Sequence, residues 1–287
     1  MKYQYIEKNR LRFGIQKMCR ALQVSLSGYY RWRKADDSKR DIENKKLLWQ
    51  IRLVHKKHKG RYGSPRITEE LKDNGYSCSE NRIARLMRKN SITAKTKRKF
   101  KVTTNSKHNL PIAENIVNGN FSASAPNCLW ASDITYIWTS KGWLYLCAIL
   151  DVFNRQIVGW SMDSRMTQEL VINALRQAIW RRKPDSGCIF HSDRGSQFAG
   201  HEFRKLLKKQ EFIQSMSGKG NCYDNAIMET FFHTLKTELV YFESYQTRRE
   251  AKRSVFEYIE MYYNRIRRHS ALNYKSPVDF GRLAGVA

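Results

Sequence analysis

In the first third of the chain, apolar residues recur every three or four positions. This spacing is typical of amphipathic helices, and it predicts helices over residues 41–58, 64–74 and 79–89. Gly75 would end the second helix, and Ser79 would cap the N-terminus of the third. The pattern therefore predicts a helical N-terminal region.

A shorter pair of helices is predicted upstream. The first lies around Ile15 to Leu22, a turn follows at Val24 and Ser25, and the second begins near Ser27, whose hydroxyl would cap it. Two short helices joined by a tight turn indicate a helix-turn-helix.

After Pro126 the pattern changes to short apolar runs separated by turn residues. It predicts strands over 129–139, 143–151, 156–162, 188–192 and 212–216, and helices over 167–182, 200–210 and 222–240. Three strands followed by alternating helices and strands is the order of a ribonuclease-H-like α/β fold, a mixed five-stranded sheet flanked by helices. The pattern alone also permits other α/β folds.

These elements suggest five segments along the chain. The expected divisions are a helix-turn-helix-like segment (1–38), a helical DNA-binding domain (39–95), a basic linker (96–125), a ribonuclease-H-like core (126–245) and a C-terminal basic helix and tail (246–287). The linker lacks hydrophobic periodicity, which is why it is separated from the domains around it.

The charge of the chain indicates a polyanionic partner. The formal net charge is +27, and residues 1–110 contain 30 Lys and Arg against 9 Asp and Glu. The alternative, a solvated basic tail, does not suit a region with this many periodic apolar residues. We therefore expect a folded DNA-binding region at the N-terminal end.

The helix predicted over 79–89 is the best candidate for DNA contact, because its basic residues lie outside its apolar stripe. These residues are Arg82, Arg85, Arg88 and Lys89, and the linker adds Lys97, Arg98 and Lys99. The alternative is an ordinary amphipathic helix with a solvated face.

The six cysteines are scattered singly, which argues against disulfides and against a cysteine zinc site. The longest apolar run, Trp143 to Leu150, suits a buried strand and is too short to span a membrane. We expect a cytoplasmic, nucleoid-associated protein with no membrane partner.

Three acidic residues occur where strands and a helix could bring them together. Asp133 interrupts a β-prone strand, Asp193 directly follows the strand over 188–192, and Glu229 lies on a helix with Asn225 and Lys236. Carboxylates are the ligands that Mg²⁺ and Mn²⁺ prefer. Two such ions can activate an attacking hydroxyl and stabilise the leaving oxygen of a phosphodiester.

The spacing and surroundings of these acids resemble a known family. Asp193 and Glu229 are separated by 35 residues, as in the D, D-35-E signature of retroviral integrases and bacterial transposases. The local sequences are Trp130-Ala-Ser-Asp133-Ile-Thr-Tyr, His191-Ser-Asp193-Arg-Gly-Ser-Gln-Phe and Asn225-Ala-Ile-Met-Glu229-Thr-Phe-Phe-His-Thr-Leu-Lys236. They resemble the OrfB-type transposases of the insertion-sequence group called IS-three, and the likeness extends over nearly the whole chain, from Phe13 to Pro277.

The resemblance implies a DNA transposase that nicks an element end and then transfers its 3′ hydroxyl to another phosphodiester. Asp133, Asp193 and Glu229 would be the catalytic metal ligands for two Mg²⁺ or Mn²⁺ ions. Lys236, ~10 Å further along the helix from Glu229, would contact the element-end DNA. Asn225 and His191 are candidates for supporting or DNA-contacting groups, with a hydrogen-bonded core role as the alternative for each.

The resemblance also implies partners. These are the terminal inverted repeats, the target DNA, further copies of the chain, and an upstream product of the element, either separate or fused.

Three other classes of protein share part of the pattern. A retroviral integrase would carry a His-His-Cys-Cys zinc domain, but His55 and His58 have no matching Cys pair. A ribonuclease-H-like nuclease or junction resolvase would have the carboxylates without strand transfer. A catalytically silent DNA-binding regulator would need only the basic N-terminal region.

Overall fold

The computed structural model describes residues 2–34, 38–95, 110–218 and 222–285. The chain divides into two compact units, Met1–Thr93 and Ala94–Ala287. Within the described residues, no helix is both long and apolar enough to cross a membrane. Among the cysteines whose side chains are described, Cys19, Cys78, Cys128, Cys147 and Cys188 are free thiols.

The first unit begins with three short helices, α1 (Lys2–Asn9), α2 (Ile15–Ala21) and α3 (Leu26–Lys34). They enclose a small core of Ile6, Met18, Cys19 and Tyr29. The predicted helix pair is confirmed, but its cap is Ser25 instead of Ser27, because the Ser25 hydroxyl accepts the Gly28 N–H at 2.8 Å. Sequence did not predict α1, since Ile6 is its only buried residue and one apolar position makes no stripe.

The same unit contains α4 (Lys39–Lys57), α5 (Ser64–Asp73) and α6 (Glu80–Lys89). All three were predicted to within two residues. The capping role of Ser79 is confirmed, because its side chain accepts the Arg82 N–H at 3.3 Å. These helices bury an apolar core that includes Ile51, Ile67, Leu71 and Ile83.

A buried ion pair joins α4 to α5. Glu70 accepts hydrogen bonds from His58 and Lys57, each at 2.7 Å, and the His58 ring stacks on Tyr62 with 3.7 Å between centroids. Burial favours the protonated acid, but the bonds from His58 and Lys57 outweigh it and lower the pKa of Glu70 to about 2. The carboxylate therefore remains charged and holds the two helices together at neutral pH.

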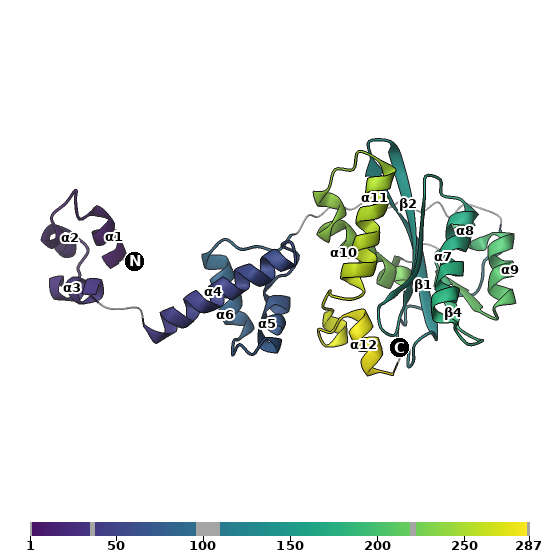
Figure 1. Cartoon of the computed structure of the whole chain (residues 1–287), viewed down its shortest axis with the longest axis horizontal. Coiled ribbons are helices and arrows are strands. Elements are labelled where there is room, and N and C mark those ends of the chain that lie inside the picture. The colour runs from purple at the N-terminus through teal and green to yellow at the C-terminus, as the bar shows by residue number, and fades with distance from the viewer. Residues whose placement is uncertain (1, 35–37, 96–109, 219–221, 286–287) are drawn as a thin grey trace. The chain divides into compact units, whose positions relative to one another are not determined.

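The second unit is built on a five-stranded sheet in the order β3-β2-β1-β4-β5 (Figure 1). Its strands are β1 (Leu129–Thr139), β2 (Gly142–Asp151), β3 (Ile157–Asp163), β4 (Ile189–Ser192) and β5 (Ile213–Met216). The first three strands form an antiparallel meander, whereas β4 and β5 run parallel to β1. This confirms the mixed sheet that the sequence predicted.

Helices cover both faces of the sheet (Figure 1). On one face lie α7 (Gln168–Arg182), α8 (Ser196–Ala199) and α9 (His201–Lys209), packed on residues such as Trp130 and Phe190. On the other face lie α10 (Ala226–Glu238), α11 (Arg248–Phe256) and the π-helix η3 (Glu257–Tyr263), packed on residues such as Ala131 and Ile137. The remaining elements are η1 (Cys222–Asn225), η2 (Val240–Phe242), η4 (Ser270–Leu272) and α12 (Pro277–Leu283).

The segments before and after the predicted core are packed into it. Val117 and Phe121, from the expected linker, lie in the same apolar cluster as α10, and the Ile116 N–H donates to Ser215 on β5 at 3.0 Å. Val255 and Ile259, from the expected C-terminal segment, belong to that cluster too. Sequence separated these segments because residues 110–125 lack periodicity and because α11 is strongly basic on its outer face.

A second buried ion pair ties the C-terminal segment to α10. Glu238 accepts two bonds from Arg267, at 2.7 and 3.0 Å, and a third from the Tyr258 hydroxyl at 2.8 Å. Asn264 pairs through its amide with the backbone N–H and carbonyl of Ile157 on β3, both at 2.9 Å. These bonds fix the helix that carries Glu229 against the sheet.

Replacing Arg267 with Ala should destabilise the chain by about 3–5 kcal/mol, because it leaves the Glu238 carboxylate buried without its guanidinium. Urea unfolding would measure the change. Arg253→Ala is the matched control, since its pair with Glu257 lies on the surface, and it should leave the transition unchanged. Equal stability of the two variants would contradict this role for Arg267.

Candidate active site

The register of β1 against β4 brings two of the acidic residues together. The parallel pairing runs from Leu129 opposite Ile189 to Ser132 opposite Ser192, and each strand continues directly into an aspartate. Neighbouring strands lie about 4.8 Å apart, so Asp133 and Asp193 follow side by side. The alternation of β1 places Asp133 on the same face as Ala131 and Ile137, which is the face that α10 covers.

The pKa of Asp133 shows that the third acid is close. Burial raises this pKa well above its usual value, the charge of Asp193 raises it further, and Glu229 also contributes. Two groups act in the opposite sense: the Ile134 N–H, 2.7 Å from the Asp133 carboxylate, and the ammonium of Lys236. Burial is therefore the main reason that the pKa of Asp133 is raised, and the neighbouring carboxylates add to it.

The turn after β4 fixes Asp193. The Gly195 N–H donates to its carboxylate at 2.9 Å, which closes a tight turn before α8 begins. A Cβ at position 195 would lie 3.0 Å from both this carboxylate and the Gln197 side chain, so glycine suits the close approach. The Asp193 side chain is half-buried, and Glu229 on α10 is exposed.

Asn225 links the start of α10 to the strand that carries Asp133. Its side-chain amide donates to the Ser132 carbonyl at 3.3 Å, and the residue is buried. Within the described part of the chain, its amide oxygen is buried and lacks a hydrogen-bond partner. Asn225 therefore has a buried, hydrogen-bonded position, which was one of its two alternatives, and the contact with Ser132 lies next to Asp133 in the chain.

His191 has the hydrogen-bonded core position that was one of its two alternatives. It is fully buried, and its Nε2 lies 2.6 Å from the Asp224 carbonyl, while its Nδ1 lies 2.9 Å from the Ser215 hydroxyl. A carbonyl only accepts, so Nε2 carries the proton and Nδ1 accepts from Ser215. Burial lowers the pKa of His191 and keeps it neutral, with a smaller opposing effect from Asp224.

Sequence reasoning missed two residues of this network. The buried Asp224 carboxylate accepts bonds from the Gly218 N–H at 2.6 Å and the Asn115 amide at 2.9 Å. Asp224 lies five residues before Glu229, and Asn115 lies in the stretch assigned to the linker. Neither had a local signal, because a polar residue in a loop is ordinarily solvated.

Lys236 lies between the acids and an aromatic ring. Its ammonium is 4.9 Å from the centroid of the Tyr136 ring, and Asp133 interacts with it electrostatically. Burial lowers the pKa of Lys236, and the nearby carboxylate partly restores it. A half-buried cation at the edge of an acidic site is well placed to meet a phosphate.

The basic residues expected to contact DNA divide into three groups. Arg82 donates to Asn44 at 2.9 Å and to Glu43 at 3.0 Å, so its guanidinium holds α6 to α4. The side chains of Arg85, Arg88 and Lys89 are exposed on α6. Lys97, Arg98 and Lys99 lie outside the described residues.

The donor set of the site suits a divalent cation, although the described residues contain no cluster of three His, Cys, Asp or Glu side chains already closed around one point. Mg²⁺ takes few carboxylates and keeps its other positions for water and phosphate. A divalent ion beside Asp133 and Asp193 would offset the burial and the charge of Asp193, which together raise the pKa of Asp133. The adjacent carboxylates of Asp133 and Asp193 therefore suit such an ion by their chemistry.

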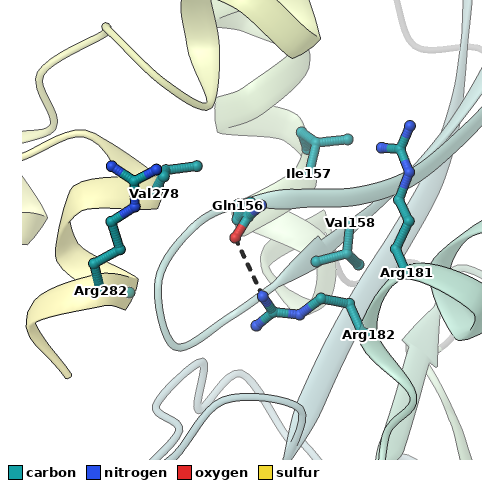
Figure 2. Close-up of a pocket in the computed structure, with 8 residues that line it drawn as sticks. Gln156, Ile157, Val158, Arg181, Arg182, Val278 and Arg282 are labelled. Atoms are coloured by element: carbon teal, nitrogen blue, oxygen red, sulfur yellow. Dashed lines mark hydrogen bonds between the residues drawn. The ribbon is translucent and has the colours of Figure 1, made fainter. Parts of the chain in front are cut away.

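A pocket of about 230 Å³ lies elsewhere in the unit, between β3, α7 and α12 (Figure 2). Arg181, Arg182 and Arg282 line it. Two of these already pair with carboxylates, Arg181 with Glu260 at 2.6 Å and Arg182 with the buried Asp151 at 3.0 Å. The pairing indicates that these arginines mainly join α7 to the sheet and η3.

Family models match most of the chain. Residues 123–222 and 229–282 each match an integrase core domain, and residues 42–100 match an HTH-like domain. The chain is 42% identical over 282 residues to "Transposase InsF for insertion sequence IS3A" of Escherichia coli (strain K12), covering 98% of each. It is 44% identical over 263 residues to "Insertion element IS600 uncharacterized 31 kDa protein" of Shigella sonnei, covering 92% of this chain and 97% of that one.

Among solved structures, the HTLV-2 integrase catalytic core domain in complex with magnesium (trimeric form) aligns with a TM-score of 0.43 and 16% identity. The alignment covers 55% of this chain and 99% of that chain.

Asp133→Asn should stabilise the chain in metal-free buffer at neutral pH, because burial and the charge of Asp193 disfavour the ionised carboxylate in the folded state. The pKa of Asp133 is higher in the folded chain than in the unfolded chain. Once the carboxyl of the unfolded chain ionises, this difference lowers the free energy of unfolding. The penalty is absent below about pH 3.9, grows as pH rises, and is complete above the folded pKa.

Thermal unfolding with and without Mg²⁺ would measure this effect. Mg²⁺ should raise the melting temperature of the native chain and leave that of Asp133→Asn unchanged. Asp185→Asn, an exposed loop substitution, is the control. A less stable Asp133→Asn variant in metal-free buffer would show that the carboxylates do not repel one another in the folded chain.

Proposed function

The chain belongs to the insertion-sequence transposases of the IS-three type, and from this premise we propose how its residues perform transposition. It is a DDE transposase, a polynucleotidyl transferase of the integrase-core class that acts in DNA transposition and integration. We propose that Asp133, Asp193 and Glu229 are its catalytic metal ligands. The observation that carries this proposal is the register of Ser132 opposite Ser192, which continues into two adjacent aspartates on the face covered by α10.

Divalent metal use fits both the integrase core and the repulsion among the three carboxylates. We propose two Mg²⁺ or Mn²⁺ ions, which when bound would activate the attacking hydroxyl and stabilise the leaving oxygen. Asp133 and Asp193 would hold them from the sheet, and Glu229 from α10. Asn225 and His191 keep β1, β4 and the start of α10 in place around the site.

The reaction proposed has two displacements at phosphorus. Water first breaks a phosphodiester at the element end and leaves a 3′ hydroxyl. That hydroxyl then forms a new phosphodiester in another strand, as the bond to that strand's own 3′ oxygen breaks. Lys236 would hold a phosphate beside the scissile one, since its ammonium reaches the edge of the acidic site.

DNA binding follows from the HTH-like match over residues 42–100 and from the basic charge of that region. We propose that α6 contacts the terminal inverted repeats through Arg85, Arg88 and Lys89, whereas Arg82 positions the helix. Joining an element end to another DNA requires two DNA segments in one assembly. The active form proposed is therefore an oligomer of this chain on DNA.

An upstream product of the element, separate or fused to this chain, is a further hypothesis about its partners. It is motivated by the family and by the lack of any sustained heptad repeat in this sequence. Purification of the chain from cells that carry the whole element would test it. Recovery of the chain in active form without any second element product would count against this partner.

Glu229→Gln should abolish the joining of labelled 3′-ended terminal-repeat DNA to a plasmid in Mg²⁺ or Mn²⁺. The loss should be about a thousandfold or more, because several kcal/mol of transition-state stabilisation disappear. Glu169→Gln, an exposed substitution on α7, is the control and should keep full activity.

Each other result of this assay would weigh against the proposal. Nicking by the native chain without joining would favour a nuclease or the need for the upstream partner. DNA binding with neither reaction would favour a silent regulator. Joining that survives in Glu229→Gln would remove Glu229 from the metal site.

Arg85→Ala should weaken binding to terminal-repeat DNA and reduce the salt dependence of binding by about one phosphate contact. This corresponds to a change of about 0.9 in the slope of log K against log salt concentration. Titrations by fluorescence anisotropy at several salt concentrations would measure it. Lys72→Ala is the control, because its ammonium already pairs with Glu69 at 2.8 Å. An unchanged slope would exclude Arg85 from the interface.

A further inference from the structure

Three aromatic residues form a cluster at the end of the β1–β2 hairpin, in which two tryptophans are exposed and the tyrosine is half-buried. The cluster comprises Tyr136 and Trp138 on β1 and Trp143 on β2, and we call it the aromatic platform. Trp138 is 59% exposed and Trp143 is 42% exposed. Large aromatic side chains this exposed and this close together are typical of a binding surface.

The rings of the platform hold one another in place. Trp138 and Trp143 are cross-strand partners, with 4.7 Å between ring centroids and an interplanar angle of 73°. Tyr136 meets Trp143 edge to face at 4.8 Å. Trp143 contacts both Tyr136 and Trp138, so the three rings restrict one another's rotation. The exposed indole of Trp138 is therefore held in a fixed orientation.

The backbone of the hairpin is also anchored. The Ser140 N–H donates to the Tyr245 carbonyl at 2.9 Å, and Arg248 donates to the Trp143 carbonyl at 3.0 Å. The turn residue Lys141 is exposed beside these anchors. An anchored hairpin loses little conformational entropy when a ligand binds to it, which favours a role in recognition.

Cations surround the platform. The ammonium of Lys236 lies over Tyr136, Arg248 binds the backbone of Trp143, and Lys141 forms the turn. Aromatic faces interleaved with positive charge suit single-stranded nucleic acid, in which the bases stack and the phosphates pair with cations. A purely apolar partner would gain nothing from these charges.

The platform is continuous with the acidic site along β1. Beyond Ser132, β1 has no pairing with β4, so the edge of the strand from Asp133 onward is not covered by that neighbour. Although Tyr136 and Trp138 point to the opposite face from Asp133, Lys236 reaches both Tyr136 and Asp133 around this edge. A DNA strand at the carboxylates could therefore extend onto the platform.

The spacing sets the position of the base that would be bound. Trp138 is five residues from Asp133, or about 16 Å along a strand that rises roughly 3.3 Å per residue. A DNA strand advances about 3.4 Å per nucleotide along the duplex axis. For a DNA strand that followed β1 with this rise, the platform would lie about five nucleotides from the scissile phosphate.

We propose that the aromatic platform binds an unpaired nucleobase of the DNA held in the acidic site, by stacking it on the indole of Trp138. The base lies about five nucleotides from the scissile phosphate, and Lys141 and Arg248 attract the phosphates beside it. This assignment rests on the proposed function, since it requires DNA at the three carboxylates. It adds a contact that depends on the base being unpaired and not on which of the four bases it is.

Terminal-repeat duplexes carrying 2-aminopurine at single positions three to seven nucleotides from the cleaved bond would test the proposal with the full chain. At one position, binding should change the 2-aminopurine fluorescence. The change should disappear in Trp138→Ala and persist in Trp138→Phe, which keeps an aromatic face. Trp180→Ala is the matched control, because Trp180 is 76% exposed on α7, near the end of the sheet opposite the hairpin.

Affinity provides a second readout. Trp138→Ala should weaken binding of the intact duplex about tenfold, and it should have no effect on a duplex lacking the base at the responsive position. An equal loss on both duplexes would show that the indole does not stack on that base. Unchanged affinity and fluorescence in Trp138→Ala would likewise overturn the proposal.

The same samples separate this proposal from the proposed function. If the native chain neither nicks nor joins DNA, the proposed function fails. If it does both and Trp138→Ala matches it in every readout, only the proposal for the platform fails.

Sedimentation of the free chain tests whether the platform is a contact between copies of the chain. A shift from dimer to monomer in Trp138→Ala, with DNA fluorescence unchanged, would make the platform a contact between copies and overturn base binding.

Discussion

The parallel pairing of β1 with β4 is the constraint on which the candidate active site depends. Because Ser132 lies opposite Ser192, the next residue of each strand is an aspartate, and two carboxylates are brought to one edge of the sheet. Burial, with the charge of Asp193 added to it, raises the pKa of Asp133 and disfavours its ionised form in the protein alone. A fold that tolerates such repulsion must obtain its stability from other contacts, and a divalent ion removes the repulsion.

Much of the buried polar bonding in the second unit acts to hold α10 against this pair of strands. His191 joins β4 to η1, Asn225 joins the start of α10 to Ser132, and Glu238 joins the end of α10 to Arg267. Glu229 lies between these attachments. A helix fastened at both ends can keep one exposed carboxylate near Asp133 without burying it, and the site stays open to a phosphate.

The two units differ in how their charged residues are distributed. Basic residues dominate the first unit, and the side chains of Arg85 and Arg88 are exposed on α6. In the second unit, acidic groups gather at the end of β4 and cations border them, as Lys236 does. The proposed contacts to the terminal repeats thus lie in the first unit, and the proposed chemistry lies in the second.

The sequence by itself determined the elements, the fold class and the acidic trio. Periodicity predicted every strand to within two residues, because a buried strand must be apolar over its length, and the motif spacing identified Asp133, Asp193 and Glu229 as candidates. It did not predict α1, α8 or α12, which are short and bury few residues.

Tertiary structure alone decided which polar residues support the site. Asn115, Asp224 and Arg267 form hydrogen bonds with residues 20 or more positions away in the sequence. Local sequence patterns cannot indicate such bonds, because the partners meet only in the folded chain. The same holds for Trp138, because its exposure is a property of the folded hairpin.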